Sequence, residues 1–356
     1  MNESRSIKGR GSAANPANRF ERIHLEMDAD WNPLEDPAPA THFLKDNSAS
    51  LITYNDSPDL GFRASANPYR GCEHGCIYCY ARPTHEYLGF SAGLDFETKI
   101  MVKARAPELL RKELSSPKWK PQLVAMSGVT DCYQPAERRF RLTRRCLEVF
   151  AEFRNPVAIV TKNFLITRDL DVLGELAKFR AVQVFISLTT LDATLTPKLE
   201  PRASLPQHRL AAIQALSRAG IPVGVLLAPI IPGLTDHEIP ALVEAAVGAG
   251  ARFASYTILR LPFGVGPLFE DWLGRHFPER KEKVLNRIKE LRGGRLNDPN
   301  FGTRMRGEGA LADRIEALFE VSCRKWRLAG PAPELDCGAF RVPSSATAQK
   351  QSMFPF

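Results

Sequence analysis

Short apolar runs and helix-periodic stretches alternate along the middle of the chain. The apolar runs are rich in Val and Ile and predict strands at 122–127, 157–161, 182–187, 222–229 and 253–259. The stretches between them have the period of amphipathic helices and lie at 136–153, 168–179, 205–219 and 238–249. Strand–helix units repeated in this way predict an α/β fold with a parallel sheet. One further strand beside residues 67–80 would bring the number of units to six.

The flanks of this region differ from it in character. Residues 1–40 are polar, rich in Pro, Ala and Asn and without a period, which predicts a disordered or loosely packed tail. Residues 41–66 predict a lead-in segment that feeds the first strand of a core domain at 67–262. Residues 263–340 predict a helical extension, and 341–356 a flexible tail. The start of the core adds three expected elements: a helix around Pro83, a strand at 96–102 and a helix at 107–114.

Composition narrows the class of protein. The 356 residues are 44% hydrophobic and 25% charged, which is typical of a globular chain. No apolar run reaches transmembrane length and the N-terminus lacks the apolar core of a signal peptide. We therefore expect a cytoplasmic protein without a membrane partner. Seven cysteines, three of them clustered, indicate metal binding in a reducing compartment rather than a disulfide framework.

The clustered cysteines are Cys72, Cys76 and Cys79, at positions i, i+4 and i+7. This spacing lets a short loop fold back so that the sulfur atoms converge, and Gly71 and Gly75 give its backbone the freedom to do so. Thiolates are soft ligands that suit iron–sulfur clusters, zinc or Cu(I). On a [4Fe–4S] cluster, three cysteine ligands leave one iron open to an outside ligand.

A structural zinc site is the alternative interpretation of these cysteines. His74 or His85 could complete a Cys₃His set. The second half of a zinc finger is missing, however, because the next cysteine, Cys132, lies far along the chain. The place of the triad at the head of a barrel pattern favours the iron–sulfur interpretation.

The loop resembles the cluster-binding loop of the radical S-adenosylmethionine (SAM) enzymes, Cys-x3-Cys-x2-Cys with an aromatic residue before the last cysteine. Tyr78 is that aromatic residue here. The resemblance implies that Cys72, Cys76 and Cys79 bind a [4Fe–4S] cluster whose open iron takes the amino and carboxylate groups of SAM. An electron from the cluster would split SAM into methionine and a 5′-deoxyadenosyl radical. The resemblance also implies the partial (β/α)6 TIM-type barrel of these enzymes, here with N- and C-terminal extensions.

Five segments resemble the spore photoproduct lyase-like branch of this superfamily, a group often described as DNA repair photolyases. They are 67–72, 78–82, 127–131, 134–135 and 258–262. This resemblance implies a lyase-type radical enzyme that acts on damaged DNA or another nucleic acid. A shared fold does not fix a substrate, so a protein, an RNA or a small molecule stays an open alternative.

Residues just after the predicted strands are candidates for SAM contacts, because a parallel barrel places its site at the carboxyl ends of its strands. The candidates are Ser127, Thr130, Asp131, Ser187, Glu200, Arg202, Ile230 and Ile231. By the resemblance, the first three would hold the methionine amino group, the next three the ribose and carboxylate, and the two isoleucines the adenine. The alternatives are helix capping for the hydroxyls and the aspartate, a surface ion pair, and an ordinary turn at the isoleucines.

A hydrogen donor to the substrate is a further candidate role. In spore photoproduct lyase a cysteine near the end of an early barrel strand returns a hydrogen atom, and Cys132 lies in a similar region here. The alternative for Cys132 is a buried small hydrophobe. We interpret Cys146, Cys323 and Cys337 as structural.

The net charge of +8 favours a polyanionic partner. Arg138, Arg141 and Arg145 would share one face of the helix at 136–153, and a second basic helix is predicted at 271–295. Together they could form a phosphate-binding groove for nucleic acid, although most charge runs are solvated faces. The resemblance further implies a reductant such as a flavodoxin or ferredoxin. The segment 349–354 distantly resembles peptides that dock on the bacterial sliding clamp.

Overall fold

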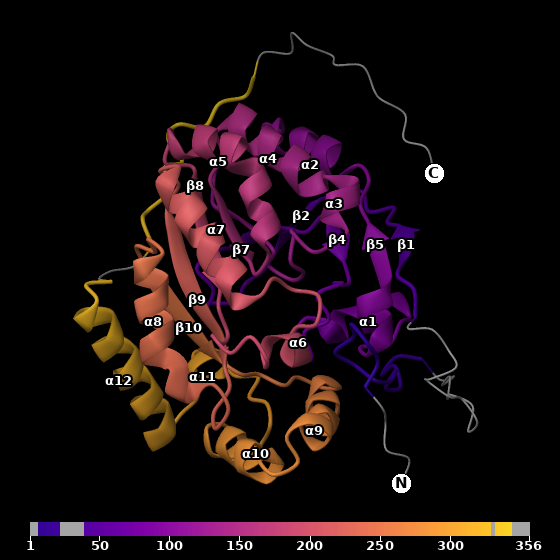
Figure 1. Cartoon of the computed structure of the whole chain (residues 1–356). Coiled ribbons are helices and arrows are strands. Elements are labelled where there is room, and N and C mark those ends of the chain that lie inside the picture. Colours follow the sequence, from indigo (N-terminus) through magenta and orange to yellow (C-terminus); the bar gives the residue numbers. More distant parts are fainter. Residues whose placement is uncertain (1–5, 22–38, 329–331, 344–356) are drawn as a thin grey trace.

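The computed structural model describes residues 6–21, 39–328 and 332–343. A seven-stranded sheet forms its centre (Figure 1). In spatial order its strands are β10 (Ala254–Ile258), β9 (Val223–Ile230), β8 (Val182–Ser187), β7 (Val157–Thr161), β6 (Val124–Met126), β3 (Ala64–Ala66) and β2 (Ile52–Tyr54). The six strands from β10 to β3 run parallel, and β2 at the edge is antiparallel. The predicted α/β fold with six parallel strands is confirmed, and β3 is the sixth strand that the pattern requires.

Helices follow the parallel strands and cover the outer face of the sheet (Figure 1). Four of them are α4 (Leu142–Phe153), α5 (Leu170–Ala177), α7 (Pro206–Arg218) and α8 (Ile239–Gly248). The remaining described helices lie elsewhere or connect these elements: η1 (Arg82–Leu88), α1 (Leu94–Thr98), α2 (Ala106–Leu114), α3 (Glu137–Phe140), η2 (Phe164–Asp169), α6 (Thr196–Leu199), η3 (Asp236–Glu238), α9 (Val265–His276), α10 (Lys281–Glu290), α11 (Thr303–Arg306) and α12 (Ala310–Lys325). Within the described residues, no helix has the length and apolar character needed to span a bilayer.

A second sheet of three strands stands beside the cysteines. In spatial order its strands are β1 (His42–Lys45), β5 (Lys99–Val102) and β4 (Tyr69–Arg70). Strand β4 leads directly into the cysteine loop. The predicted strand at 96–102 is shorter in the structure, because its first residues belong to helix α1.

Every second side chain of the parallel strands is buried, which explains why Val and Ile recur in their sequences. In β7 and β8 the side chains without exposed surface are Val157, Ile159, Val182, Val184 and Ile186. Burial of each such side chain stabilises the fold by about 1.5–3 kcal/mol. The same strands carry polar residues at their carboxyl ends, and these build the site.

The helix predicted at 136–153 is two helices, α3 and α4. The break lies at Arg141, whose φ of 51° is left-handed. The carboxylate of Glu137 causes the new start, because it accepts hydrogen bonds from the backbone N–H groups of Thr143 at 2.9 Å and Arg144 at 3.3 Å. Arg141 therefore lies between two helices, and the predicted single helical face of Arg138, Arg141 and Arg145 is wrong.

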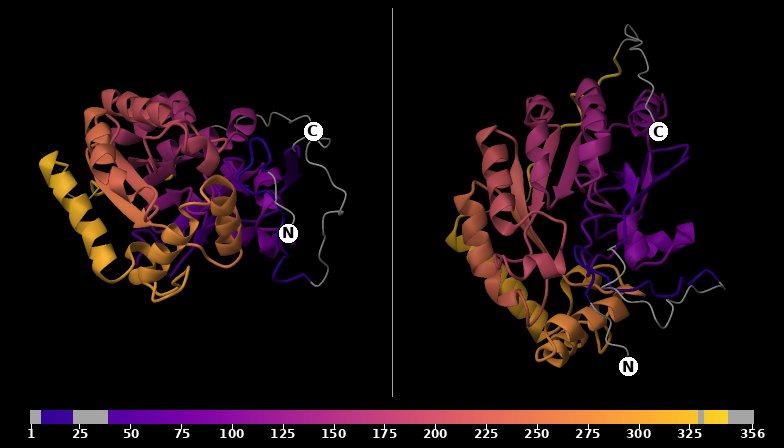
Figure 2. Two further views of the ribbon diagram at one scale, coloured as in Figure 1. Left: turned by 60° about the horizontal axis from the view of Figure 1, so that its bottom comes forward. Right: turned by 45° about the vertical axis from the view of Figure 1, so that its right-hand side comes forward.

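The basic helix predicted at 271–295 is also divided, into α9 and α10, with Pro278 between them. Helix α10 lies at the lower edge of the molecule and α4 at its upper edge (Figure 1). The right-hand view of Figure 2 keeps this separation. The two basic groups thus lie at opposite ends of the molecule and do not line one groove.

Glu137 ties several elements together in the interior. It accepts hydrogen bonds from Tyr69 Oη at 2.5 Å and Arg168 Nη2 at 2.7 Å, in addition to the start of α4. Removal of one partner from a buried ion pair costs about 3–5 kcal/mol. We expect Glu137→Ala to lower the free energy of unfolding by this amount in urea titrations. The control is Glu148→Ala, which breaks a more exposed ion pair with Arg144 and should cost about 1 kcal/mol or less. Equal losses in both variants would contradict the prediction.

Candidate active site

The cysteine loop connects β4 to η1, and its turns require glycine. Gly71 and Gly75 have φ values of 79° and 67°, in the left-handed region that favours glycine. A Cβ atom on Gly75 would lie 2.8 Å from Glu97 Oε2, so there is no room for a side chain. Cys72 and Cys76 are buried and Cys79 is half-buried.

Arg82 holds the loop from within. It has no exposed surface and donates from Nε to the carbonyl of Cys76 at 2.9 Å and from Nη2 to the carbonyl of Gly75 at 3.3 Å. Nη2 also forms an ion pair with Glu97 at 2.5 Å. On the opposite flank, Gln134 accepts from the N–H of Glu73 and donates to the carbonyl of Gly71, both at 3.0 Å. The loop is thus fixed by side chains on both flanks.

Residues 6–21 clamp the loop from outside. Their contact point is Glu97, whose carboxylate accepts from the N–H of Gly11 at 3.1 Å and of Ser12 at 2.9 Å. A Cβ atom on Gly11 would lie 1.9 Å from the carbonyl oxygen of Gly75, so the two backbones touch. The prediction of a loosely packed tail over 1–40 is therefore wrong for residues 6–21. Residues 22–38 lie outside the described residues.

The donor set of the loop fits an iron–sulfur cluster. Burial raises the pKa of Cys76 to about 12 and also raises the pKa of Cys72, so thiolates form here only when a cation compensates their charge. Across the described ranges, no three His, Cys, Asp or Glu side chains are placed to share one metal ion. A [4Fe–4S] cluster presents a separate iron to each thiolate, so its ligands do not have to converge on one point.

The two histidines that could complete a zinc site have other contacts. His74 Nε2 lies 3.1 Å from Asn163 Nδ2, and His74 Nδ1 lies 3.4 Å from Asp131 Oδ2. His85 Nε2 lies 2.9 Å from the carbonyl of Lys99. One nitrogen of each ring is therefore occupied, whereas Nδ1 of each is buried without a hydrogen-bond partner. Within the described residues, neither histidine belongs to a group of three or more side chains that could hold one metal ion, and this weighs against the zinc alternative.

A buried charge network joins the loop to the barrel. Glu200 accepts hydrogen bonds from Tyr78 Oη and from Arg209, and from Thr189 Oγ1 at 3.0 Å. Lys162 Nζ, from the loop after β7, lies 2.9 Å from Tyr78 Oη and 3.2 Å from Glu200 Oε1. The residue before the last cysteine of the triad is therefore anchored to residues that follow β7 and β8.

The charge states in this network are fixed by its geometry. Burial alone would raise the pKa of Glu200, but Arg209 and Lys162 hold it far below its ordinary value. Burial alone would lower the pKa of Lys162, but Cys76 and Glu200 raise it. The network thus keeps one carboxylate and two cations charged beside the cysteine loop.

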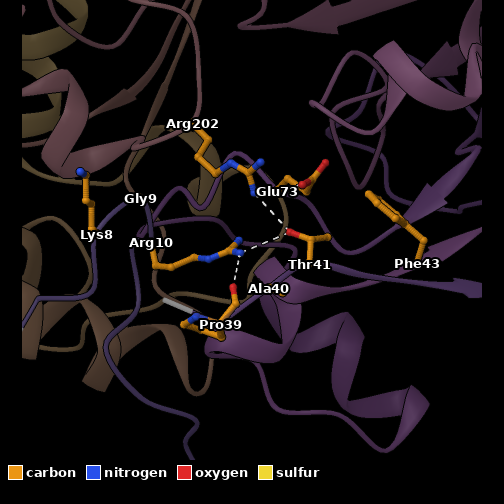
Figure 3. A pocket seen from close by; sticks show the side chains of 9 residues that line it. All are labelled: Lys8, Gly9, Arg10, Pro39, Ala40, Thr41, Phe43, Glu73 and Arg202. Atoms are coloured by element: carbon orange, nitrogen blue, oxygen red, sulfur yellow. Dashed lines mark hydrogen bonds and ion pairs between the residues drawn. The ribbon is translucent and has the colours of Figure 1, made fainter. Parts of the chain in front are cut away.

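Glu200 and Arg202 do not face one site. Arg202 turns away to the surface, where Nη1 forms an ion pair with Glu73 at 2.9 Å and lies 3.3 Å from Thr41 Oγ1 (Figure 3). There it lines a cavity of about 430 Å³ together with Lys8 and Arg10. The predicted joint contact of the two residues with SAM finds no support in this arrangement.

The predicted residues after β6 are occupied with holding their own loop. Ser127 Oγ accepts from the N–H of Cys132 at 2.9 Å, and Thr130 Oγ1 donates to the carbonyl of Tyr69 at 2.9 Å. Asp131 accepts from Thr161 Oγ1 at 2.8 Å and, through its second oxygen, from the N–H of Lys162. These residues do not cap a helix, because α3 begins after Ala136. Their proposed contacts with methionine stay predictions.

The remaining candidates lie in two apolar clusters. Ile231 is buried beside Cys76 and Tyr78, whereas Ile230 belongs to the main core of the barrel. Ser187 is buried, and its Oγ donates to the carbonyl of Ala228 at 3.0 Å. All three are buried, and their proposed contacts with SAM stay predictions.

Cys132 has no exposed surface and packs in the main core. Burial raises the pKa of its thiol well above the ordinary value. A hydrogen donor must meet its substrate, and in this structure Cys132 is closed off from solvent. This environment agrees with the alternative role given for Cys132 from the sequence, that of a small buried hydrophobic residue.

The comparisons with known proteins place the chain in a family. The model of the radical SAM superfamily matches residues 66–246. The chain belongs to the radical SAM superfamily. The match begins at the end of β3 and includes the cysteine loop and the strands β6 to β9.

This radical SAM protein is similar to the following relatives and solved structure. It is 38% identical to an uncharacterized protein of Mycobacterium tuberculosis, over 81% of this chain and 82% of the relative. It is 26% identical to the radical SAM Nalpha-GlyT isomerase of Pseudomonas phage M6, over 64% of this chain and 46% of that protein. Its fold resembles that of spore photoproduct lyase complexed with dinucleoside spore photoproduct, with a TM-score of 0.56, 15% identity and coverage of 80% and 79% of the two chains.

The structure adds four site residues that the sequence did not identify as candidates: Arg82, Gln134, Lys162 and Arg209. Three of them stand in or beside stretches that the sequence singles out. Arg82 and Gln134 lie in the segments that resemble the spore photoproduct lyase-like branch, and Lys162 follows a predicted strand. Arg209 could have been found from its place on the inner, buried face of an amphipathic helix. A charged residue there needs a buried partner.

The contacts of Arg82 predict that the cysteine loop depends on it. Arg82→Met removes the donors to the loop carbonyls and leaves Glu97 buried without its cation, at a cost of about 3–5 kcal/mol. We expect a clear loss of iron after anaerobic reconstitution and faster hydrogen exchange of the loop amides. Arg111→Met is the control, because Arg111 pairs with Glu152 at the surface. Iron content and exchange equal to wild type in Arg82→Met would contradict this role.

Proposed function

We propose that this protein is a radical SAM enzyme in which Cys72, Cys76 and Cys79 hold a [4Fe–4S] cluster. When bound, the cluster supplies the electron that cleaves SAM reductively into methionine and a 5′-deoxyadenosyl radical. The observation that carries the proposal is the buried three-thiol loop, which Tyr78 joins to the charged residues Glu200 and Lys162. The protein's part is to hold this loop, to orient SAM and to keep water out.

Lys162 is the residue best placed to receive the carboxylate of SAM. Its side chain is 14% exposed, so its ammonium can reach a ligand without being fully solvated. Tyr78 and Glu200 fix the position of the ammonium from behind. Ile231 and its apolar neighbours would cover the adenine. In this proposal Glu200 is a positioning residue that keeps Lys162 charged and in place.

An external reductant is part of the proposal. In the described ranges the other cysteines are dispersed: Cys132 and Cys146 lie in the main core, Cys323 packs at its edge, and Cys337 is exposed. They offer no second cluster, so the electron has to come from a partner such as a flavodoxin or ferredoxin. The sliding-clamp prediction falls on 349–354, which lie outside the described residues.

We further propose a nucleic acid as the substrate class, with damaged DNA as one example. The basic charge of the chain and the fold shared with spore photoproduct lyase, whose structure contains a dinucleoside, support it. A protein or a small molecule is the alternative. Reaction of reduced, SAM-loaded protein with candidate oligonucleotides, followed by analysis of 5′-deoxyadenosine and of the bases, tests the choice.

The cysteine assignment predicts a selective loss of iron. Replacement of any one of Cys72, Cys76 and Cys79 by Ala should abolish cluster binding, because each thiolate holds a different iron. Cys323→Ala and Cys337→Ala should keep the wild-type iron content and still form 5′-deoxyadenosine from SAM and dithionite. Iron near the wild-type level in Cys76→Ala would overturn the assignment.

The position of Lys162 predicts a specific loss of SAM affinity. Lys162→Met should weaken SAM binding about 10- to 150-fold, the equivalent of one charge-assisted hydrogen bond of about 1.5–3 kcal/mol. Equilibrium dialysis with labelled SAM measures the affinity, and iron analysis checks that the cluster is retained. Lys178→Met, at an exposed pair with Glu175, is the control. Unchanged affinity in Lys162→Met would remove Lys162 from the SAM site.

A further inference from the structure

Arg260 stands beside the cysteine loop at the carboxyl end of the barrel. It lies two residues beyond the end of β10. Its Cζ atom is 5.5 Å from the centre of the Tyr80 ring, and Tyr80 directly follows Cys79. Tyr80 is half exposed and is held by a hydrogen bond from its Oη to the carbonyl of Gly128 at 2.8 Å. Arg260 and Tyr80 therefore form part of the surface that a substrate of this site would meet.

The guanidinium of Arg260 has no carboxylate partner in the described part of the chain. Its Nη1 lies 3.3 Å from Met305 Sδ, a weak acceptor, and its Nε is buried without a hydrogen-bond partner. The nearby Arg304 differs, because both its Nε and its Nη2 bind the carboxylate of Asp59 at 2.6 Å. Arg304 is therefore paired with a carboxylate, whereas Arg260 has N–H donors without a strong acceptor.

The charges around Arg260 do not compensate its own. Burial and the charge of Arg304 lower the pKa of Arg260, and they outweigh Tyr80, Asp59 and Asp298, which raise it. Arg292 also lies close, buried against the carbonyls of Ile258 and Leu259 at the end of the same strand. A half-buried cation held next to other cations is electrostatically unfavourable unless an anion binds there. The charge distribution therefore fits an anionic group of a ligand.

Aromatic rings alternate with the arginines on this surface. Phe301 is 54% exposed and lies under Arg304, with 4.6 Å between the ring centre and Cζ. Tyr80 offers a second half-exposed ring beside Arg260. Rings that stack on bases and arginines that bind phosphates are the combination by which proteins hold single strands or displaced nucleotides. An acidic peptide would use the cations and leave the rings without a role.

We propose that Arg260 binds a backbone phosphate of a nucleic-acid substrate, with the Tyr80 and Phe301 rings contacting the adjoining bases. The inference rests on the proposed radical SAM function and adds to it the residue that places the strand beside the cysteine loop. It also places the phosphate contact on a residue that belongs to neither of the two basic groups of the sequence. A guanidinium fork suits this task, because it binds two phosphate oxygens at once.

The chain supplies a matched pair of variants for the test. Arg252 lies two residues before β10 and Arg260 two residues after it, so they stand at opposite ends of one strand. Arg252 is exposed, and the two substitutions Arg260→Gln and Arg252→Gln change net charge equally. A fluorescent single-stranded oligonucleotide is titrated with cluster-loaded protein, and binding is measured by anisotropy at several salt concentrations.

We expect Arg260→Gln to bind the oligonucleotide about 10- to 150-fold more weakly at low salt, as one charge-assisted contact is lost. The slope of log K against log salt should fall by about 0.7, the value for one phosphate of a single strand. Arg252→Gln should behave as wild type does. Arg260→Lys keeps the charge without the fork and should recover part of the affinity, which shows that a loss in Arg260→Gln is not misfolding.

Iron content and SAM cleavage without substrate separate the two proposals. If Arg260→Gln keeps both and binds the oligonucleotide as wild type does, the inference is wrong while the proposed enzyme stands. The inference is also wrong if wild type cleaves SAM but binds only an acidic peptide in an Arg260-dependent manner. If wild type holds no cluster and cleaves no SAM, the proposed function fails independently of the binding result.

Discussion

The ion pair between Arg82 and Glu97 is the constraint on which the cysteine loop depends. Both side chains are without exposed surface, so their charges have been removed from water at considerable cost. Further hydrogen bonds of both side chains stabilise the pair: Arg82 binds loop carbonyls, and Glu97 binds the N–H groups of Gly11 and Ser12. Loop, helix α1 and N-terminal segment therefore form one unit. A change in any of them alters the backbone that carries the thiols.

A second buried carboxylate, Glu200, holds the other side of the loop through Tyr78. Its compensating cations, Arg209 and Lys162, come from different βα units of the barrel. The loop is thus fastened to the N-terminal segment by one acidic residue and to the barrel by another. Such anchoring keeps the thiols in position before a cofactor binds, which reduces the ordering that binding has to impose. This explains why the loop from β4 to η1 needs so many supporting side chains.

The sequence predicts those parts of the structure that depend on neighbouring residues. It does not predict those that depend on contacts between distant residues. Val and Ile located the strands, because the buried positions of each strand require apolar side chains. The spacing of Cys72, Cys76 and Cys79 located the loop. The break at Arg141 could not be predicted, since the carboxylate of Glu137 starts α4 from outside the helix. The packing of residues 6–21 was hidden for the same reason: their partner, Glu97, is about 85 residues away. The opposite directions of Glu200 and Arg202 follow from their tertiary partners alone.

The availability of arginine side chains to a ligand also depends on contacts between distant residues. A sequence counts arginines, but pairing decides which of them are available to a ligand. Arg144 binds Asp171, and Arg304 binds Asp59, so these charges are largely neutralised within the fold. Arg260 belongs to no run of basic residues and would not be chosen by composition. Its unused donors, its neighbours of like charge and its contact with Tyr80 beside Cys79 distinguish it only in three dimensions. In a basic protein, an unpaired cation beside the candidate active site is therefore better evidence of a ligand contact than the total charge.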